Sequence, residues 1–403
     1  MTEHTGTNRA TPGARGRRRA RKAVIVGGGI GGLTTAIALR RVGIEAEVYE
    51  RAAEFRAAGS ALSVMSNAVT ALDTLGIDLH LDKYGQRIRR FQIRSGRGTL
   101  IRTLPFEEAC RKAGAPSYCV SRAGLHQALL SAADCPIEMG AGAVAFEQHD
   151  DGVGVRFEDG RTAEGDVLIG ADGFRSAVRG QLAGLDDVRD GGYLCWLGIV
   201  DFHHPRFVTG YVGHYWGDGQ RFGLIDIGGG RAYWWGTKAM TLTDSAAWKG
   251  GKDDVARFYA GWAEEVREVI ALTPDADIIT VPAQDRPFLE RWGTGRVTLL
   301  GDAAHPMLTS LGQGAAMAME DAVVLAQSLA TAEDPARGLR TYEDRRRERN
   351  RELVLASRTA SNAQHSENFL RRLKRDTYYR TVPRRVLVER DAAVLSYPAP
   401  PVP

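Results

Sequence analysis

The stretch AVIVGGGIGGLTTAIAL, residues 23–39, decides how this chain folds. Gly27, Gly29 and Gly32 form a G-x-G-x-x-G motif directly after a short apolar strand and at the start of an apolar helical pattern. In such a motif the first glycine permits a sharp turn, the second lets the backbone approach a pyrophosphate, and the third lets helix and strand pack closely. With a second strand expected at 46–49, the stretch predicts a βαβ unit that binds a dinucleotide.

Glu50 ends the second expected strand, 18 residues after the last glycine of the motif. A carboxylate at this place accepts hydrogen bonds from an adenosine ribose, which disfavours a 2′-phosphate. The helix N-terminus adds free N–H groups and partial positive charge for the pyrophosphate. These features predict FAD or NAD and leave the choice between them open.

The rest of the chain alternates between α/β and antiparallel patterns. Alternating residues predict a hairpin from 88–93 and 99–104, and a strand-rich aromatic stretch from 191 to about 239 predicts a separate antiparallel sheet. A strand at 297–300 and the helix after it return the chain to the dinucleotide domain. The charged segment 340–379 is largely helical in pattern. We expect its arginines to lie on a solvated helix face, namely Arg345, Arg346, Arg347 and Arg349.

Composition and charge narrow the classes of function. The chain has 403 residues, 43% of them hydrophobic and 25% charged, which is enough for two globular domains. The formal net charge is +4; residues 1–22 contribute +6 through seven basic side chains and Glu3, so the remainder carries −2. We therefore expect no nucleic-acid partner, and no apolar run is long enough to span a membrane. The four cysteines show neither metal-ligand nor disulfide spacing, which predicts no metal and a reducing cytoplasm: Cys110, Cys119, Cys135 and Cys195.

Two later segments resemble the fingerprints of a known family. VLIGADGFRSAVR (167–179) and GRVTLLGDAAHPMLTSLGQGAAMAMEDA (295–322) are similar to the second and third fingerprints of the FAD-dependent aromatic-ring hydroxylases, a group of flavoprotein monooxygenases. SRAGLHQALL (121–130) matches the family's helix whose arginine reaches FAD. The resemblance covers nearly all of residues 23–340 and implies that the dinucleotide is FAD.

The resemblance also implies which residues hold the cofactor. The first fingerprint binds the ADP half of FAD, the Asp-Gly segment serves the flavin and nicotinamide pyrophosphates, and Asp302 binds a ribityl hydroxyl. A helix that starts at 312–314 directs N–H groups at the negative charge of a reduced flavin. The expected cofactor-binding residues are Gly27, Gly29, Ile30, Gly31, Gly32, Glu50, Arg51, Arg122, Asp172, Gly173, Arg179, Gly301, Asp302, Gly312, Gln313, Gly314 and Ala315.

The implied reaction is reduction of FAD by NAD(P)H, capture of O₂ as a peroxyflavin, and hydroxylation or epoxidation of a small aromatic or polycyclic substrate. NAD(P)H is expected as a transient co-substrate because no second dinucleotide domain is visible. No protein base is assigned as catalytic, and His305 is expected to pack or form hydrogen bonds. The alternative is a flavin-dependent dehydrogenase or reductase on the same fold. Thr309 stands where the family usually has proline, which puts the local loop geometry in question.

The strand-rich region is expected to form the roof of the substrate cavity. We predict that four of its aromatic residues line the pocket: Trp196, Tyr215, Phe222 and Trp235. Strand alternation allows only some aromatic residues to face a cavity, and the others form sheet core. Several relatives carry arginine where Leu197 stands, which argues against an anionic substrate. His203, His204 and His214 are possible acids or bases that spacing does not distinguish.

The predicted architecture is α/β, with a doubly wound Rossmann-like FAD domain, a second antiparallel substrate domain and a helical C-terminal tail. The FAD domain is discontinuous and is expected to comprise 21–85, 108–184 and 283–340. The substrate domain is expected at 86–107 and 185–282, the helical tail at 341–403, and a disordered tail at 1–20. We expect a monomer or homodimer.

Overall fold

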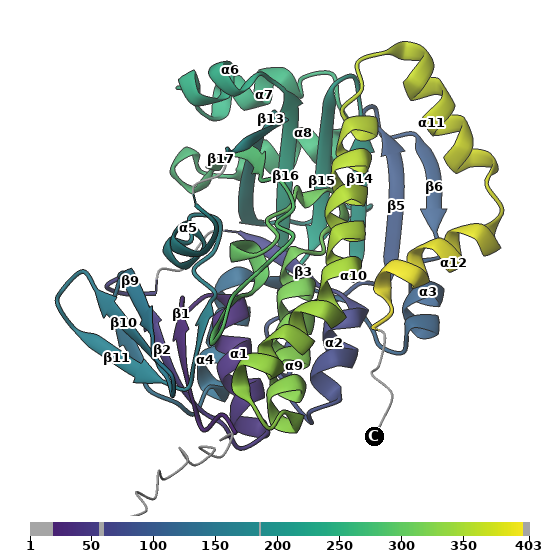
Figure 1. Ribbon diagram of the computed structural model, residues 1–403. Helices are drawn as coiled ribbons and strands as arrows, with labels where there is room; N and C mark the ends of the chain where they lie inside the picture. Colours follow the sequence, from purple (N-terminus) through teal and green to yellow (C-terminus); the bar gives the residue numbers. More distant parts are fainter. Residues whose placement is uncertain (1–18, 56–59, 185–186, 398–403) are drawn as a thin grey trace, which may run out of the picture.

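The computed structural model describes residues 19–55, 60–184 and 187–397, which form two main sheets (Figure 1). Most of the expected tail at 1–20 lies outside the described residues, as do 185–186 at an expected domain boundary. The parallel sheet lies at the bottom of the view and the larger, mainly antiparallel sheet above it.

The parallel sheet has five strands in the order β18-β12-β1-β2-β8. Each neighbouring pair is parallel. The carboxyl ends of the strands therefore meet at one edge, where open α/β sheets bind their ligands. The doubly wound arrangement predicted from the glycine motif is confirmed. Its strands are β1 (Lys22–Val26), β2 (Glu45–Glu50), β8 (Ile137–Met139), β12 (Val167–Gly170) and β18 (Val297–Leu299).

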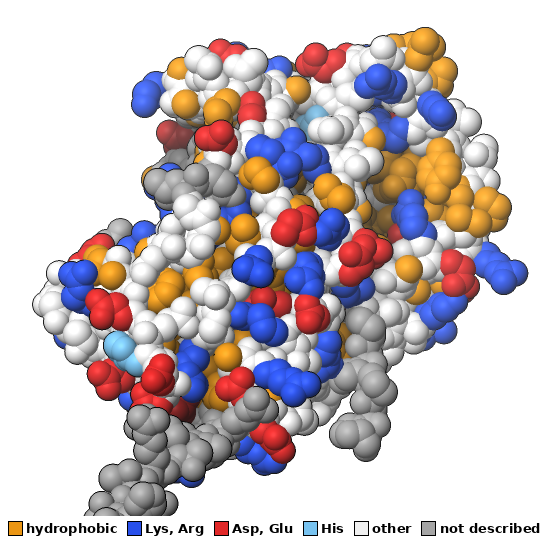
Figure 2. All heavy atoms as spheres, viewed as in Figure 1, with side chains coloured by type: hydrophobic (Ala, Val, Ile, Leu, Met, Phe, Trp, Pro, Cys, Tyr) orange, Lys and Arg blue, Asp and Glu red, His pale blue; other side chains and the backbone are white. Residues whose placement is uncertain are grey.

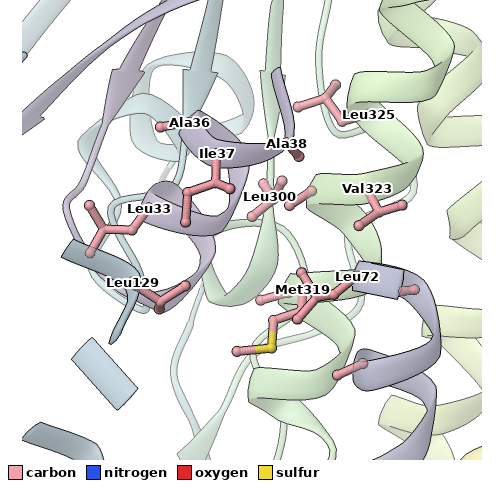
Figure 3. Packing of buried hydrophobic residues seen from close by; sticks show 14 of the residues in the cluster. Leu33, Ala36, Ile37, Ala38, Leu72, Leu129, Leu300, Met319, Val323 and Leu325 are labelled. Atoms are coloured by element: carbon pink, nitrogen blue, oxygen red, sulfur yellow. The ribbon is translucent and has the colours of Figure 1, made fainter. Parts of the chain in front are cut away.

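Two helices far apart in sequence pack side by side against this sheet. Helix α1 (Ile30–Arg41) contributes Leu33 and Ile37, and helix α9 (Gly314–Thr331) contributes Met319, to one buried cluster (Figure 3). Burying each large apolar side chain contributes about 1.5–3 kcal/mol to folding. The late segment of the chain is thereby joined to the first βαβ unit.

The second main sheet has seven strands in the order β17-β13-β16-β15-β14-β5-β6. The predicted hairpin β5–β6 joins this sheet from an earlier part of the chain, and β5 pairs with β14 in parallel, whereas the other neighbours are antiparallel. Its strands are β5 (Arg90–Ser95), β6 (Leu100–Leu104), β13 (Arg189–Asp201), β14 (Tyr211–Trp216), β15 (Gln220–Asp226), β16 (Arg231–Ala239) and β17 (Ile279–Asp285).

Shorter elements complete the fold. The small sheets contain β3 (Ala61–Val64), β4 (Gly85–Arg87), β7 (Tyr118–Ser121), β9 (Ala143–Gln148), β10 (Val153–Phe157) and β11 (Thr162–Gly165). The remaining helices before α9 are α2 (Ser66–Asp73), α3 (Phe106–Ala113), α4 (Arg122–Ala132), α5 (Ala177–Ala183), α6 (Leu242–Ala247), α7 (Lys252–Phe258) and α8 (Glu264–Leu272). Among the described residues, no helix is both long enough and apolar enough to cross a membrane.

Helix α10 (Pro335–Gln364) connects the two sheets (Figure 1). Near its start, the hydroxyl of Tyr342 donates to the carbonyl of Leu299 in β18, and just past its end His365 contacts Thr237 in β16. Helices α11 (Phe369–Thr381) and α12 (Arg384–Leu395) follow it. The segment formed by α10 and the residue after it therefore contacts both main sheets.

The prediction that the arginines of α10 are solvated is wrong for Arg346. Its side chain is 1% exposed and contacts Asp321 at 2.6 Å and Glu320 at 2.5 Å, both on α9. Arg349 also binds Glu320, at 2.9 Å, whereas Arg345 stays exposed. Figure 2 shows the mixed acidic and basic side chains on the face where α10 lies, which is the pattern the sequence displays. Charge alternation did not reveal which arginine faces inward.

Replacing Arg346 with methionine is expected to lower the free energy of unfolding by about 3–5 kcal/mol, because it leaves the buried carboxylates of Glu320 and Asp321 without this counter-charge. Urea unfolding measures the change. Arg345→Met is the matched control and should change stability by less than about 0.5 kcal/mol. Equal effects of the two variants would contradict a stabilising role for the buried contact.

Candidate active site

The loop after β1 leaves room for a ligand at one glycine and none at the others. Gly27 has φ +108°, and a Cβ there would lie 2.3 Å from the carbonyl oxygen of Ala171. A Cβ on Gly32 would lie 1.9 Å from the carbonyl oxygen of Gly27. Gly29, the N-cap of α1, is different, since a Cβ there meets no atom of the described residues within 4 Å. The open side of this loop therefore lies at the helix N-terminus, where a pyrophosphate binds.

Glu50 holds the same loop from the end of β2. Its carboxylate accepts a 2.8 Å hydrogen bond from the N–H of Gly28 and another from the N–H of Ala52. His126 contacts the carbonyl oxygen of Gly28 at 2.9 Å from helix α4. Glu50 thus orders the glycine turn and keeps further lone pairs for ribose hydroxyls.

Asp302 lies just after β18. The residue is exposed to solvent, yet many protein atoms surround its carboxylate. Burial raises the pKa of Asp302, while the nearby charges of His305 and Arg122 oppose that rise. Among the described residues, no donor forms a hydrogen bond to this carboxylate. Arg122 is the first residue of α4, and its guanidinium likewise binds no described acceptor. Both groups fit hydroxyl or phosphate oxygens of an FAD molecule.

A second helix N-terminus opens toward the same edge. Gly312 has φ +63° and ends a short 3₁₀ turn that starts at Thr309, and α9 begins at Gly314, where a Cβ meets nothing within 4 Å. The side chain of Gln313 is buried and accepts a 2.9 Å hydrogen bond from Asn67. The 312–314 turn is therefore held from behind. The N–H of Gly312 donates to the carbonyl oxygen of Thr309, whereas no described group accepts from the N–H groups of Gln313 and Gly314, which remain available to an anionic ring together with the open side of Gly314. An FAD molecule fits these two helix ends and the Asp302 carboxylate.

Several expected cofactor residues have protein partners. Asp172 caps helix α5 by accepting hydrogen bonds from Ser176 and Ala177. Arg179 is buried and donates to the carbonyl oxygens of Ala303 and Ala304, so it supports the loop that carries Asp302. The other residues of the expected set border the two helix starts or the strand ends: Ile30, Gly31, Arg51, Gly173, Gly301 and Ala315.

His305 and Asp321 stabilise the loop that carries Asp302. His305 contacts Asp321 at 2.6 Å, as a hydrogen-bonding residue rather than an exposed base, and Gly301 donates its N–H to the same carboxylate at 3.3 Å. Burial opposes ionisation of Asp321, but His305 and Arg346 outweigh it and hold the pKa of this carboxyl well below its ordinary value. Asp321 is therefore a structural anion that supports the loop at 301–313, between β18 and α9. This loop is called the cofactor loop below, because FAD is expected to bind beside it.

Three of the four predicted substrate residues lie in sheet core. Trp196, Tyr215 and Phe222 are 0% exposed and pack toward helices α6, α7 and α8 on the outer face of the seven-stranded sheet. Tyr215 donates its hydroxyl to Glu265 of α8 at 2.9 Å. These positions do not fit a pocket-lining role. The prediction failed because successive side chains of a strand point to opposite faces of the sheet. The sequence shows many aromatic residues, but it does not show which of the two faces the helices cover.

Trp235 lies on the opposite, inner face. Its cross-strand partners there are Leu197 and Gly223, and its ring occupies the space where a side chain of Gly223 would project. Trp235, Leu197 and His214 are all part-exposed, in contrast to Trp196, Tyr215 and Phe222 on the outer face. Around Trp235 the inner face is thus the more open of the two. It meets the cofactor loop where the Tyr193 hydroxyl lies 3.4 Å from that of Thr309.

Two neutral histidines occupy this inner side. Burial, with a further contribution from Arg221, lowers the pKa of both His214 and His365 to about 3. His365 stacks on Tyr193 with ring centroids 4.1 Å apart, and its Nε2 lies 2.9 Å from the Thr237 hydroxyl. His203 and His204 instead line a separate surface hollow of about 530 Å³. Of the three histidines considered as acids or bases, His214 thus lies on the inner face, whereas His203 and His204 do not.

Sequence reasoning missed Arg221, Tyr193 and His365. Arg221 had a signal, since it is an arginine within the apolar strand RFGLI (221–225). Tyr193 and His365 carried none, because they meet only after α10 crosses the inner face. Among the described residues, no cluster of His, Cys, Asp and Glu is arranged to hold a metal ion.

Comparisons with known proteins agree with this geometry. The family model described as "FAD binding domain" matches residues 21–357. The chain is 38% identical over 341 residues to the aurachin C monooxygenase/isomerase of Stigmatella aurantiaca, covering 83% of this chain and 87% of that protein. It is 33% identical to the FAD-dependent urate hydroxylase of Klebsiella pneumoniae subsp. pneumoniae, covering 86% and 91%. The crystal structure of Klebsiella pneumoniae HpxO with FAD and uric acid matches with a TM-score of 0.86 at 30% identity, covering 93% of this chain and 96% of that one.

Gly29→Val is expected to give a folded protein that purifies nearly free of flavin, because the added side chain meets open space in the protein but blocks close approach of a pyrophosphate. Flavin absorbance per protein and the melting temperature measure the two effects. Gly32→Val is the contrast: its Cβ clashes with backbone, so it should lower the melting temperature. Full flavin occupancy in a folded Gly29→Val protein would overturn this assignment.

Stability is expected to fall as pH drops from about 6.5 toward 3. In that window His214 and His365 bind protons in the unfolded chain, whose histidine pKa is about 6.5, but not in the folded protein. Above it, both contribute their full stability. His214→Phe should flatten the slope of unfolding free energy against pH by up to about 1.4 kcal/mol per pH unit. Urea unfolding at a series of pH values tests this, and an unchanged slope would show that His214 titrates normally.

Proposed function

The chain belongs to the family of FAD-dependent aromatic-ring hydroxylases, and from this premise we propose that it hydroxylates or epoxidises a small aromatic or polycyclic substrate held on the inner face of the seven-stranded sheet. It is an FAD-dependent monooxygenase, which uses NAD(P)H and O₂. The observation that supports the proposed location is the contrast between the two sheet faces: the outer one is closed by helices and the inner one stays open beside the cofactor loop.

The residues that would hold FAD come from four strand ends. The loop at Gly27–Gly32 and Glu50 would hold the ADP half, and Asp302 with Arg122 the region between adenine and flavin. The N-terminus of α9 at Gly314 would lie at the flavin ring, where its partial positive charge stabilises negative charge on a reduced ring. FAD supplies the chemistry that amino-acid side chains lack, namely acceptance of hydride and activation of O₂.

The side chains of this chain orient the substrate and exclude water. Trp235 and Leu197 offer a flat apolar surface to an aromatic ring. His214 is neutral and forms no hydrogen bond with any described residue, so its ring nitrogens are available to a polar substituent. Tyr193, stacked on His365, closes the side of the inner face next to Thr309. We assign no catalytic base to the protein.

NAD(P)H binds transiently in this proposal, because neither the sequence nor the part of the fold that the structure describes offers a second dinucleotide domain. The four cysteines are free thiols, which supports a reducing compartment such as the cytoplasm. The relatives named above act on aurachin C and urate, and a heteroaromatic substrate for this chain is consistent with the inner face. A monomer or homodimer is proposed.

The holoenzyme is expected to oxidise NAD(P)H faster in the presence of a substrate and to transfer one atom from O₂ to it. A panel of phenols, indoles, quinolones and urate, screened for stimulated NAD(P)H oxidation and then for ¹⁸O from ¹⁸O₂ by mass spectrometry, tests this. Leu197→Arg, on the inner face, should alter which substrates stimulate oxidation, whereas Leu355→Arg, exposed on α10, should not. Oxidation of NAD(P)H with product that never contains ¹⁸O would indicate a reductase instead.

A further inference from the structure

Arg221 is a buried cation on the inner face of the substrate sheet. It lies on β15, is 3% exposed, and its guanidinium lies 4.8 Å from the centre of the Trp235 ring. Its cross-strand partners are Thr237 and Trp216, so it lies diagonally from Trp235 on the same face. The guanidinium is therefore next to the part-exposed surface on which we place the substrate.

No carboxylate among the described residues pairs with Arg221, and its Nε has no hydrogen-bond partner. The neighbouring Arg375 is also a cation, with Asp376 as its own partner. The groups around Arg221 that could titrate are Tyr193, Cys195, Tyr259, Tyr379, His214 and His365. Burial raises the pKa of Tyr193 and Cys195 and lowers that of the two histidines, so these four stay uncharged near neutral pH.

An unpaired charge in such a position costs folding free energy, because it loses hydration without gaining a counter-charge. Burial lowers the pKa of Arg221 to about 10, which still leaves it protonated at neutral pH. The Trp235 ring offsets part of the cost through a cation–π contact. The remaining cost is consistent with a group that is retained for binding an anion rather than for stability.

We propose that Arg221 provides the counter-charge for an anionic oxygen of the substrate, so that the enzyme selects aromatic substrates bearing a phenolate, enolate or carboxylate over their neutral analogues. The proposal rests on the proposed location of the substrate. It revises the expectation drawn from Leu197, because Arg221 places a positive charge on the inner face from β15. Leu197 and Arg221 both lie on the inner face, on either side of Trp235.

Binding of matched anionic and neutral ligands to the FAD holoenzyme, by isothermal titration calorimetry without nicotinamide, tests the proposal. Benzoate is paired with benzamide, and 4-nitrophenolate, above the pH at which it ionises, with 4-nitroanisole. The wild-type enzyme should bind at least one anion about 10–100-fold more tightly than its neutral partner, as a hydrogen bond to a charged group gives. The pair that shows the preference identifies carboxylate or phenolate as the group bound.

Arg221→Met should remove this preference and Arg221→Lys should keep most of it. Arg257→Met, at an exposed position of α7, should leave the preference unchanged while removing the same charge. The melting temperature separates binding from structure. Because Arg221 is an unpaired buried cation, Arg221→Met should keep or raise the melting temperature while anion binding weakens. The proposal fails if the wild-type enzyme prefers neither anion, or if Arg221→Met lowers the melting temperature and leaves the preference intact.

This test is independent of turnover. Stimulated NAD(P)H oxidation with ¹⁸O incorporation establishes the reaction, whereas the binding experiment addresses only the charge of the ligand. An enzyme that oxygenates substrates but shows no anion preference would refute the role of Arg221 alone. An enzyme with the anion preference and no oxygenation would refute the reaction and leave Arg221 as an anion-binding residue.

Discussion

The site depends on the buried carboxylates of Glu320 and Asp321, adjacent residues of α9. Asp321 accepts from Arg346 on α10, contacts His305 and receives the N–H of Gly301, while Glu320 contacts Arg346, Arg349 and Asn67. Burying such charges is costly unless each has a partner, and here every carboxylate oxygen has one. Because those partners come from distant parts of the chain, the network aligns the cofactor loop with α9 and α10.

That alignment has a direct consequence for the substrate side. Helix α10 carries the network at Arg346. About three turns further along the same helix, Ser357 donates its hydroxyl to the carbonyl oxygen of Leu308. Past its end, His365 stacks on Tyr193 of the substrate sheet. A single helix therefore sets the spacing between the cofactor loop and the inner face. Fixed spacing of this kind helps to hold a substrate in a reactive position against a cofactor.

The substrate sheet divides its residues between stability and binding by strand alternation. The outer face buries Trp196, Phe222 and Trp234 against helices, and stacked and edge-on rings there make a well-packed core. The inner face combines part-exposed apolar residues with neutral histidines and with Arg221, which pairs with no carboxylate of the described residues. Burying such an arginine in a hydrophobic core costs folding free energy. The two faces of the sheet therefore differ in the chemistry of their side chains as well as in exposure.

The sequence by itself determined the doubly wound domain, the dinucleotide-binding motif and the order of the fingerprints. Gly27, Gly29 and Gly32 lie within six residues of one another, and Glu50 ends the next strand of the same βαβ unit, so their arrangement follows from spacing within one supersecondary motif. The tertiary structure alone decided that Arg346 is buried, that Trp235 rather than Trp196 faces the open side, and that Arg221 has no carboxylate partner among the described residues. Each of these depends on segments 25 or more residues apart in the chain or on which sheet face the helices cover. Charge and aromatic content along a chain do not specify those contacts, because they arise only when distant segments pack together.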